Sequence, residues 1–243
     1  MTPEEKIRYA RHITLPELGE AGQQRLRDAA VLVVGLGGLG SAASLYLAAA
    51  GVGRMLLNDF DIVDPTNLQR QLLFTDADVG RRKVDAAHAL LAARYPDVDF
   101  VQHDGRLDGR GLREVMAGAD VVLDCSDNFG TRFSLNAASV ATHTPLVSGA
   151  AVRLRGQVLS FSGGSPCYAC LFDEDDETLD DCAGNGVLAS LVGVIGTMQA
   201  VEAMRVLAGI GTPAHGRLLR FDAASLSWDE STFARDPGCS VCK

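Results

Sequence analysis

A strand, a glycine-rich loop and a helix follow one another near the start of the chain, and this order most constrains the fold. The apolar, β-branched run Val31-Leu32-Val33-Val34 predicts a buried strand, and Gly35-Leu36-Gly37-Gly38-Leu39-Gly40 comes directly after it. The Ala- and Leu-rich segment 41–50 then predicts a helix. Glycine lets the backbone approach a phosphate without a Cβ clash, and a helix start offers free N–H groups and a positive dipole end. The segment therefore predicts a nucleotide site in an α/β fold.

Charged residues beyond the loop bear on which nucleotide binds there. Asp59 lies about twenty residues further on, where a carboxylate accepts hydrogen bonds from ribose hydroxyls. Up to this point NAD and ATP fit equally. Arg70, within Asn67-Leu68-Gln69-Arg70-Gln71, and Lys83 add cationic groups, which stabilise the charge that develops when a phosphorus is attacked. They favour phosphate chemistry, although solvated surface charges would look the same in the sequence.

Two patterns of secondary structure divide the chain. The first pattern alternates candidate strands at 31–35, 54–58, 98–102 and 121–125 with candidate helices at 39–50, 81–95, 110–118 and 130–142. Such alternation predicts right-handed crossovers and a parallel, Rossmann-like sheet. After Pro145, short turns separate candidate strands at 146–150, 157–161, 217–221 and 226–232, with a long helix interposed at about 186–209. We expect antiparallel hairpins there, and one α/β domain over residues 1–243, with a nucleotide-binding half at about 25–145 and an antiparallel half at about 146–243.

Composition narrows the partners and the compartment. Hydrophobic residues make up 47% and charged residues 22%, an ordinary profile for a soluble globular protein. The net charge of -9 argues against nucleic acid, because affinity for a phosphate backbone comes from a basic face. Residues 1–10 are charged and lack the apolar region of a signal peptide, while the apolar segments 31–53 and 186–201 fit buried elements better than membrane spans. We expect a cytoplasmic protein that binds neither nucleic acid nor a membrane.

Four of the six cysteines form two CxxC pairs, Cys167 with Cys170 and Cys239 with Cys242. Four thiolates in two such pairs suit tetrahedral Zn²⁺, and without an open ligand position the site would be structural. Disulfides are the competing interpretation, which a cytoplasmic chain disfavours. We expect a four-cysteine zinc knuckle that joins the C-terminal tail to the loop after residue 163, which makes the antiparallel half the zinc-binding half.

The two remaining cysteines differ in their surroundings. Cys125 ends an apolar strand and fits a small buried hydrophobe. Residues 173–181 are acidic except for Thr178 and Leu179, which is typical of a solvated loop; a mobile loop across the active site is the functional alternative. Cys182 lies between this run and a helix start that would lower the pKa of a thiol, so it is a tentative catalytic nucleophile. An inert loop thiol fits the sequence equally.

Taken together, these features resemble the ThiF/MoeB/HesA family, the bacterial relatives of the ubiquitin-activating enzyme, and look closest to its MoeB branch. The likeness runs from residue 9 to the last CxxC pair, and its most specific stretches are 35–40, 59–61, 67–71, 124–128, 145–150 and the paired CxxC. Members adenylate the C-terminal glycine of a small ubiquitin-like sulfur carrier protein, forming an acyl adenylate and pyrophosphate from MgATP. The resemblance thus implies an adenylyltransferase that uses ATP, Mg²⁺ and Zn²⁺, in molybdopterin, thiamine or related sulfur biosynthesis. It also implies a carrier ending in Gly-Gly.

The resemblance also assigns roles to the matching residues. Those expected at the nucleotide are Gly38 in the loop, Asp59 at the ribose, Asn67, Arg70 and Lys83 at the phosphates, Asp127 at the Mg²⁺, and Asn128 beside it near the nucleotide. Arg11 matches an arginine that reaches the triphosphate of the neighbouring subunit, which implies a homodimer. Arg132 matches a position of the motif but receives no role. A cysteine matching Cys182 forms a covalent link with the carrier in the thiamine branch and is dispensable in the molybdopterin branch.

Two other functions remain open from the sequence. An NAD-dependent oxidoreductase could use the same fold, but no catalytic His–Asp or Tyr–Lys pair is evident, and Arg70, Lys83 and Asp127 would be unexplained. A zinc-stabilised binding module with a purely structural nucleotide site is the non-enzymatic alternative. No rhodanese-like domain follows the adenylation region, so we expect a separate sulfur donor.

Overall fold

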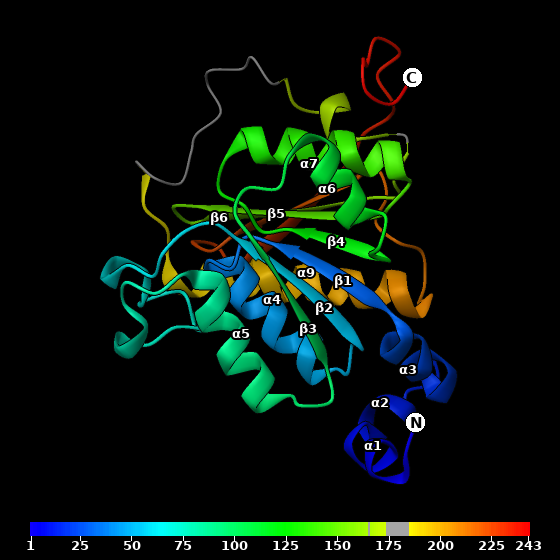
Figure 1. Cartoon of the computed structure of the whole chain (residues 1–243). Helices are drawn as coiled ribbons and strands as arrows, with labels where there is room; N and C mark the ends of the chain where they lie inside the picture. Colours follow the sequence, from blue (N-terminus) through cyan, green and yellow to red (C-terminus); the bar gives the residue numbers. More distant parts are fainter. Residues whose placement is uncertain (165, 174–184) are drawn as a thin grey trace.

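The computed structural model describes residues 1–164, 166–173 and 185–243, and a single eight-stranded sheet runs through them (Figure 1). Its strands are β1 (Ala30–Val34), β2 (Arg54–Asp59), β3 (Asp99–Asp104), β4 (Val121–Asp124), β5 (Leu146–Val152), β6 (Arg155–Phe161), β7 (Arg217–Asp222) and β8 (Ser227–Thr232). They lie in the order β3-β2-β1-β4-β5-β6-β7-β8. Neighbours from β3 to β5 pair in parallel, and those from β5 to β8 pair antiparallel. The predicted parallel half continued by antiparallel strands is confirmed.

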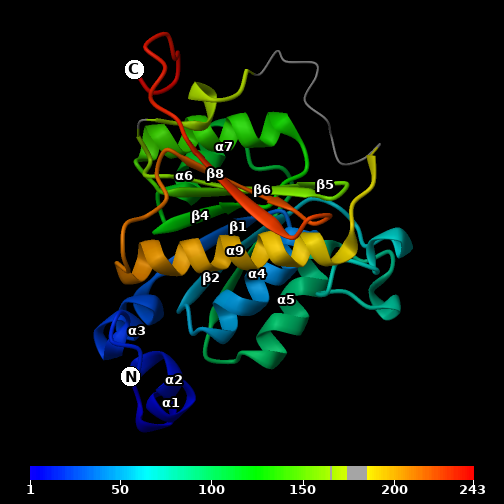
Figure 2. The same ribbon diagram turned by 180° about the vertical axis from the view of Figure 1, so that it is seen from behind.

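Helices cover both faces of the sheet (Figures 1 and 2). One face carries α4 (Gly38–Ala49), α5 (Lys83–Arg94) and α9 (Ala189–Ala208), and the other carries α6 (Gly109–Met116) and α7 (Phe129–Thr142). The N-terminal segment forms α1 (Pro3–Arg8), α2 (Ala10–Ile13) and α3 (Gly19–Asp28), and the short 3-10 helices are η1 (Pro65–Asn67), η2 (Asp76–Asp78) and η3 (Tyr168–Cys170).

Strand β1 lies in the middle of the parallel half, and this position explains why its sequence is apolar throughout. Val31 and Val33 belong to the core beneath α4, α5 and α9, whereas Leu32 and Val34 belong to the core beneath α6 and α7. Successive side chains of a strand point to opposite faces, so a strand covered on both faces must be apolar at every position.

Most predicted elements are confirmed to within a few residues, and the helix predicted at 81–95 shows why boundaries move. The structure begins α5 only at Lys83. Arg82 has an extended backbone and forms an antiparallel bridge with Ile62, and the carbonyl of Arg81 accepts a hydrogen bond from the N–H of Val63. The two arginines are therefore held in a strand-like pairing that periodicity in the sequence does not reveal.

Among the described residues one helix, α9, is long and apolar enough to cross a membrane. Half of its most apolar window is buried within the fold. Leu191, Ile195 and Ala203 are buried in the core between α9 and the sheet. This packing is that of a core helix, in agreement with the buried helix expected from the sequence.

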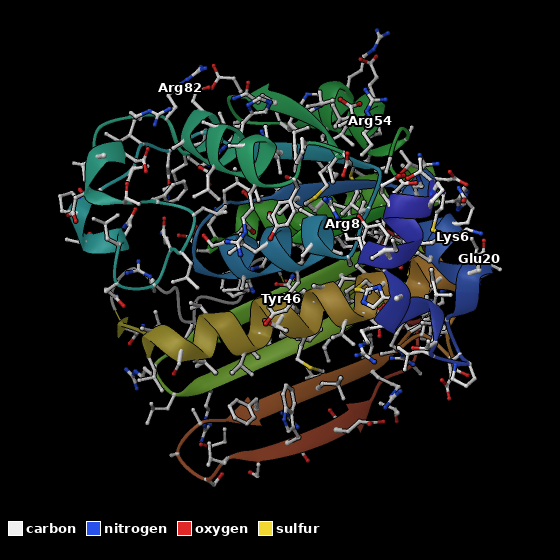
Figure 3. The ribbon with its side chains drawn as sticks, turned by 90° about the horizontal axis from the view of Figure 1, so that it is seen from below. Lys6, Arg8, Glu20, Tyr46, Arg54 and Arg82 are labelled. Carbon is white, nitrogen blue, oxygen red and sulfur yellow. The ribbon has the colours of Figure 1, made fainter. Side chains whose placement is uncertain are left out.

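Two salt bridges join the N-terminal helices α1 and α3, and one buried ring packs this segment into the fold. Lys6 pairs with Glu20, as Figure 3 shows, and Arg27 pairs with Glu5, but such exposed pairs contribute little stability. Tyr9, between α1 and α2, is buried. Burial of the Tyr9 ring therefore stabilises the position of the segment that carries Arg11 more than these surface salt bridges do.

The order of the parallel strands locates the site. From β1 the chain moves outward to β2 and β3, and then returns to β4 on the opposite side of β1. In such doubly wound sheets a crevice forms at the carboxyl ends of the two strands where the order reverses. The glycine loop after β1 and the segment after β4 meet at this crevice.

Candidate nucleotide site

A cavity of about 430 Å³ opens at the carboxyl ends of β1, β2 and β4. Its walls come from the glycine loop, the end of β2, residues 69–71, the start of α5, the segment after β4 and residues 186–192. The residues predicted for the nucleotide that line it are Gly38, Asp59, Arg70, Lys83, Asp127 and Asn128. The fold thus brings together most of the predicted site from segments that are distant in the sequence.

Two glycines of the loop permit contacts that no other residue would allow. A Cβ atom at Gly40 would lie 1.9 Å from the carbonyl oxygen of Gly35, and one at Gly38 would lie 2.5 Å from the side chain of Val192 on α9. Gly38 begins α4, whose first N–H groups have no carbonyl partner within the helix. The loop is therefore packed tightly against its surroundings while its N–H groups remain available to an anion.

We expect Gly40→Ala to destabilise the protein by about 3 kcal/mol, because the loop has to move to admit the methyl group. Gly193→Ala is the matched control: it also lies in a helix, nothing lies within 4 Å of its added Cβ, and it should stabilise by about 0.5–1 kcal/mol. Denaturant unfolding of both variants tests this. Equal stability of the two variants would contradict the close packing of the loop.

Asp59 ends β2 at the floor of the cavity. Its carboxylate accepts hydrogen bonds from the N–H groups of Leu36 at 2.7 Å and of Asp61 at 2.8 Å. Burial raises the pKa of Asp59, and Lys83 and these two N–H groups oppose that shift. Each oxygen accepts one backbone hydrogen bond and keeps a second lone pair, so both can still accept from ribose hydroxyls.

Two cationic side chains, Lys83 and Arg70, also line the cavity. The side chain of Lys83 is only 7% exposed, and its Nζ lies 2.9 Å from the carboxylate of Asp61. Arg70 donates through Nη1 to the carbonyl oxygen of Thr66 at 3.0 Å, which folds the guanidinium back over its own turn. Both groups line the same cavity as the glycine loop, an arrangement that suits an anionic ligand.

Two further arginines that received no role from the sequence also line the cavity. Arg132 is buried and donates through Nη2 to the carbonyl oxygens of Ser126 at 2.9 Å and Gly149 at 3.4 Å. Arg106 lies over the ring of Phe60, 5.2 Å from its centroid. Arg106 follows the end of β3 and therefore lies at the same sheet edge as Asp59. This position after a strand is the feature of the sequence that could have indicated Arg106 as a site residue.

Two aspartates near the end of β4 have different environments: Asp124 is the last residue of the strand, and Asp127 lies three residues beyond it. Asp124 is fully buried, and its carboxylate accepts from the N–H of Ser126 at 3.1 Å and from the hydroxyls of Ser126 and Ser148, both at 2.6 Å. Asp127 is exposed at the mouth of the cavity. Asp124 therefore shapes the turn, whereas the carboxylate of Asp127 is open to the solvent and to the cavity.

Not every predicted residue reaches the cavity. Asn128 lines it but also caps α7, because its Oδ1 accepts from the N–H of Thr131 at 2.9 Å. Asn67 and Arg11 are not among the described residues that line the cavity. Asn67 uses its carbonyl oxygen to close the turn before Arg70. Arg11 is exposed on α2, near the amino end of β1, and the predicted nucleophile Cys182 lies outside the described residues.

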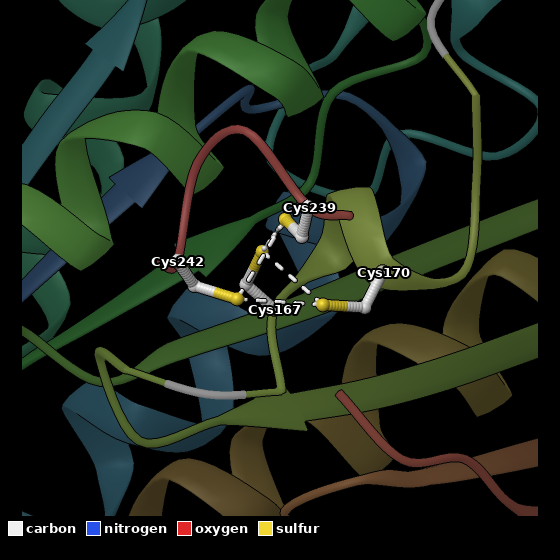
Figure 4. Close-up of side chains that lie close together, drawn as sticks. All are labelled: Cys167, Cys170, Cys239 and Cys242. Atoms are coloured by element: carbon white, nitrogen blue, oxygen red, sulfur yellow. Dashed lines mark hydrogen bonds between the residues drawn. The ribbon is translucent and has the colours of Figure 1, made fainter. Parts of the chain in front are cut away.

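The two CxxC pairs meet at a second site (Figure 4). The Sγ atoms of Cys167, Cys170, Cys239 and Cys242 lie within 4.8 Å of one another, and neighbouring pairs are separated by 3.4–3.9 Å. All four are free cysteines rather than disulfide partners. Tetrahedral Zn²⁺ with Zn–S bonds of about 2.3 Å separates its sulfurs by about 3.8 Å, so the cluster has the size that zinc requires.

The surroundings shift the pKa values of two of these thiols in opposite directions. Burial, as the main cause, raises the pKa of Cys167 to about 12. Burial raises the pKa of Cys239, but the N–H groups of Cys242 and Val241 outweigh it and lower that pKa to about 7. Asn136 donates through Nδ2 to the Sγ of Cys167 at 3.5 Å. Hydrogen bonds to sulfur of this kind orient the ligands of a metal site.

Comparisons with known proteins agree with this geometry. The profile of the ThiF family matches residues 9–241. The chain is 46% identical over 244 residues to the molybdopterin-synthase adenylyltransferase of Escherichia coli K12, covering 100% of this chain and 98% of that protein. It is 45% identical, over 100% of this chain and 97% of the relative, to the sulfur carrier protein ThiS adenylyltransferase of the same organism. The crystal structure of E. coli MccB with ATP shares the fold, with a TM-score of 0.84 and 23% identity, over 97% of this chain and 74% of that one.

Proposed function

The chain belongs to the ThiF family, and we propose on that basis that it is an adenylyltransferase that activates the C-terminal glycine of a small ubiquitin-like sulfur carrier protein. ATP would supply the adenylyl group, the carrier carboxylate would attack the α-phosphorus, and pyrophosphate would leave. The proposal covers residues 1–243 as one adenylation domain. Which carrier is used, in molybdopterin, thiamine or related sulfur biosynthesis, is the open part of the assignment.

One observation carries the proposal: a single cavity combines an anion-binding glycine loop, a ribose acceptor and cationic groups. The first N–H groups of α4 would bind phosphate oxygens, and Asp59 would bind the ribose. Lys83 and Arg70 would stabilise the charge that develops as pyrophosphate departs. Mg²⁺, when bound, supplies further positive charge at the phosphates, and Asp127 is the residue that would hold it.

A second cavity, of about 480 Å³, supports a polypeptide substrate. It shares Asp127, Arg132 and Ala150 with the nucleotide cavity and continues over strands β5 to β8. An extended C-terminal tail placed there would present its carboxylate beside Asp127. Positioning two reactants in this way contributes a large part of the rate of a bimolecular transfer.

We further propose a homodimer. Arg11 is exposed far from the nucleotide cavity of its own chain, so it could reach a nucleotide only in a second copy. Three apolar side chains are exposed on the adjacent helices α4 and α9: Tyr46, which Figure 3 labels and which is 58% exposed, Val194 and Val201. A subunit interface on these helices would cover them.

Zinc at the cysteine cluster, a cytoplasmic location and a separate sulfur donor complete the proposal. Zinc would be structural, because four thiolates leave no position for substrate. Nothing in the comparisons supports the NAD-dependent oxidoreductase alternative, since the close relatives are named adenylyltransferases.

The direct test is ATP–pyrophosphate exchange with purified protein and each candidate carrier ending in Gly-Gly. Exchange should depend on the carrier and disappear when the carrier lacks its terminal glycine. Turnover of NAD in place of this exchange would contradict the proposal, and the carrier that gives the highest rate identifies the pathway.

We expect Cys182→Ala to leave pyrophosphate exchange within about twofold of the wild type, because a carboxylate attacks phosphorus without help from a thiolate. Sulfur transfer to the same carrier, measured with a sulfur donor, then distinguishes the branches; we favour retention, as in the molybdopterin branch. Loss of exchange in this variant would contradict the separation of adenylation from sulfur chemistry. Ser190→Ala, at the start of α9, is the matched control.

A further inference from the structure

A carboxylate that received no role in the sequence analysis holds Lys83 at two points. Oδ2 of Asp61 lies 2.9 Å from the Nζ of Lys83, and the carbonyl oxygen of Asp61 accepts from the N–H of Lys83, also at 2.9 Å. Both the backbone and the ammonium group of this lysine are thus bound to one residue. Both residues line the nucleotide cavity.

The local fold fixes this arrangement. Ile62 pairs with Arg82 in an antiparallel bridge, and the N–H of Val63 donates to the carbonyl oxygen of Arg81 at 2.8 Å. The bridge places the residue before Ile62 opposite the residue after Arg82, which are Asp61 and Lys83. Their contact therefore follows from backbone pairing rather than from two mobile surface chains.

Asp61 is also connected to the ribose side of the cavity. Its N–H donates to the carboxylate of Asp59 at 2.8 Å, so one short segment joins the predicted ribose acceptor to the predicted phosphate cation. The two carboxylates are close enough for the charge of Asp61 to raise the pKa of Asp59, after burial as the main cause.

The exposure of the two partners differs in a way that suggests a role. The Lys83 side chain is 7% exposed, whereas that of Asp61 is 51% exposed. A buried ammonium group needs a counter-charge, and Asp61 supplies one from the side of the solvent. An ammonium group has three N–H donors, so one bond to Asp61 leaves two for phosphate oxygens.

We propose that Asp61 is a positioning residue for adenylation: it directs the Nζ of Lys83 towards the phosphates and does not itself bind them. This inference rests on the proposed function and gives a role to a residue that the resemblance left without one. It predicts that Asp61 acts only through Lys83.

The test compares Asp61→Asn, Lys83→Met and the double variant in carrier-dependent pyrophosphate exchange. We expect Asp61→Asn to lower kcat about 10- to 100-fold with little change in the KM for ATP, because a misdirected cation mainly weakens the transition state. The double variant should be no slower than Lys83→Met, since the two changes remove one shared interaction. Asp61→Glu, which keeps the charge, should be more active than Asp61→Asn.

Asp76→Asn is the matched control, an exposed aspartate of the same loop whose side chain makes no hydrogen bond or salt bridge within the described part of the chain; it should match the wild type. Wild-type rates in Asp61→Asn, a lower KM for ATP, or additive losses in the double variant would each overturn the inference. Absence of exchange in the wild-type protein with every carrier would instead overturn the proposed function. Melting temperatures of all variants separate these outcomes from misfolding.

Discussion

Asp127→Ala should lower carrier-dependent pyrophosphate exchange by about 100- to 1,000-fold while the fold remains intact, which is the scale for loss of one electrostatic stabiliser at a reacting phosphate. The reason lies in the difference between Asp124, which ends β4, and Asp127, which follows the strand. The carboxylate of Asp124 is occupied by three donors from serines, whereas Asp127 is exposed at the mouth that both cavities share. Initial rates over a range of Mg²⁺ concentrations measure the effect.

Glu114→Ala is the control for this variant, because Glu114 is an exposed carboxylate on α6 whose one salt bridge within the described residues is to Arg110, four residues away. It should leave both the exchange and the melting temperature unchanged. Full exchange in Asp127→Ala, with a normal Mg²⁺ dependence, would show that another group supports the metal.

The second large effect concerns the cysteine cluster. Elemental analysis should find one zinc per chain, and the double variant Cys239→Ser/Cys242→Ser should lose it. We expect its melting temperature to fall by about 10 °C, because a chain of this size loses about 2–4 °C per kcal/mol and a structural zinc contributes several kcal/mol. Adenylation should decline less than stability, since the cluster lies outside the nucleotide cavity.

Ser240→Ala is the matched control, an exposed residue between the two changed cysteines. It should keep both the metal and the melting temperature. Metal-free protein that is fully folded, with two disulfides in place of four thiolates, would exclude the zinc site.

Most residues that the resemblance assigns to the nucleotide meet in one cavity, because these motif residues follow the ends of neighbouring strands. The loop 35–40 and Asp127 follow β1 and β4, which pair in parallel, so their side chains meet at one edge. The position of Asp59 in this cavity could be expected for the same reason, since β2 pairs with β1. The cysteine spacing likewise predicted the four-thiol cluster, because each CxxC pair is local and only two pairs had to meet.

Other parts of the site depend on contacts between segments that carry no motif. Arg132 and Arg106 line the cavity because α7 and the end of β3 turn towards it, and Asn67 does not line it because its turn is closed by its own backbone. The partnership of Asp61 with Lys83 depends on one antiparallel bridge between two irregular segments.

The sequence by itself determined the α/β class, the parallel half followed by antiparallel strands, the glycine loop and the grouping of the cysteines, since hydrophobic periodicity and motif spacing are local properties. Only the tertiary structure decided which charged side chains face the cavity, as Arg132 does, and which are held elsewhere, as Asp124 is by its serines. A charge is assigned to packing or to chemistry by its neighbours in space, and those neighbours come from distant parts of the chain.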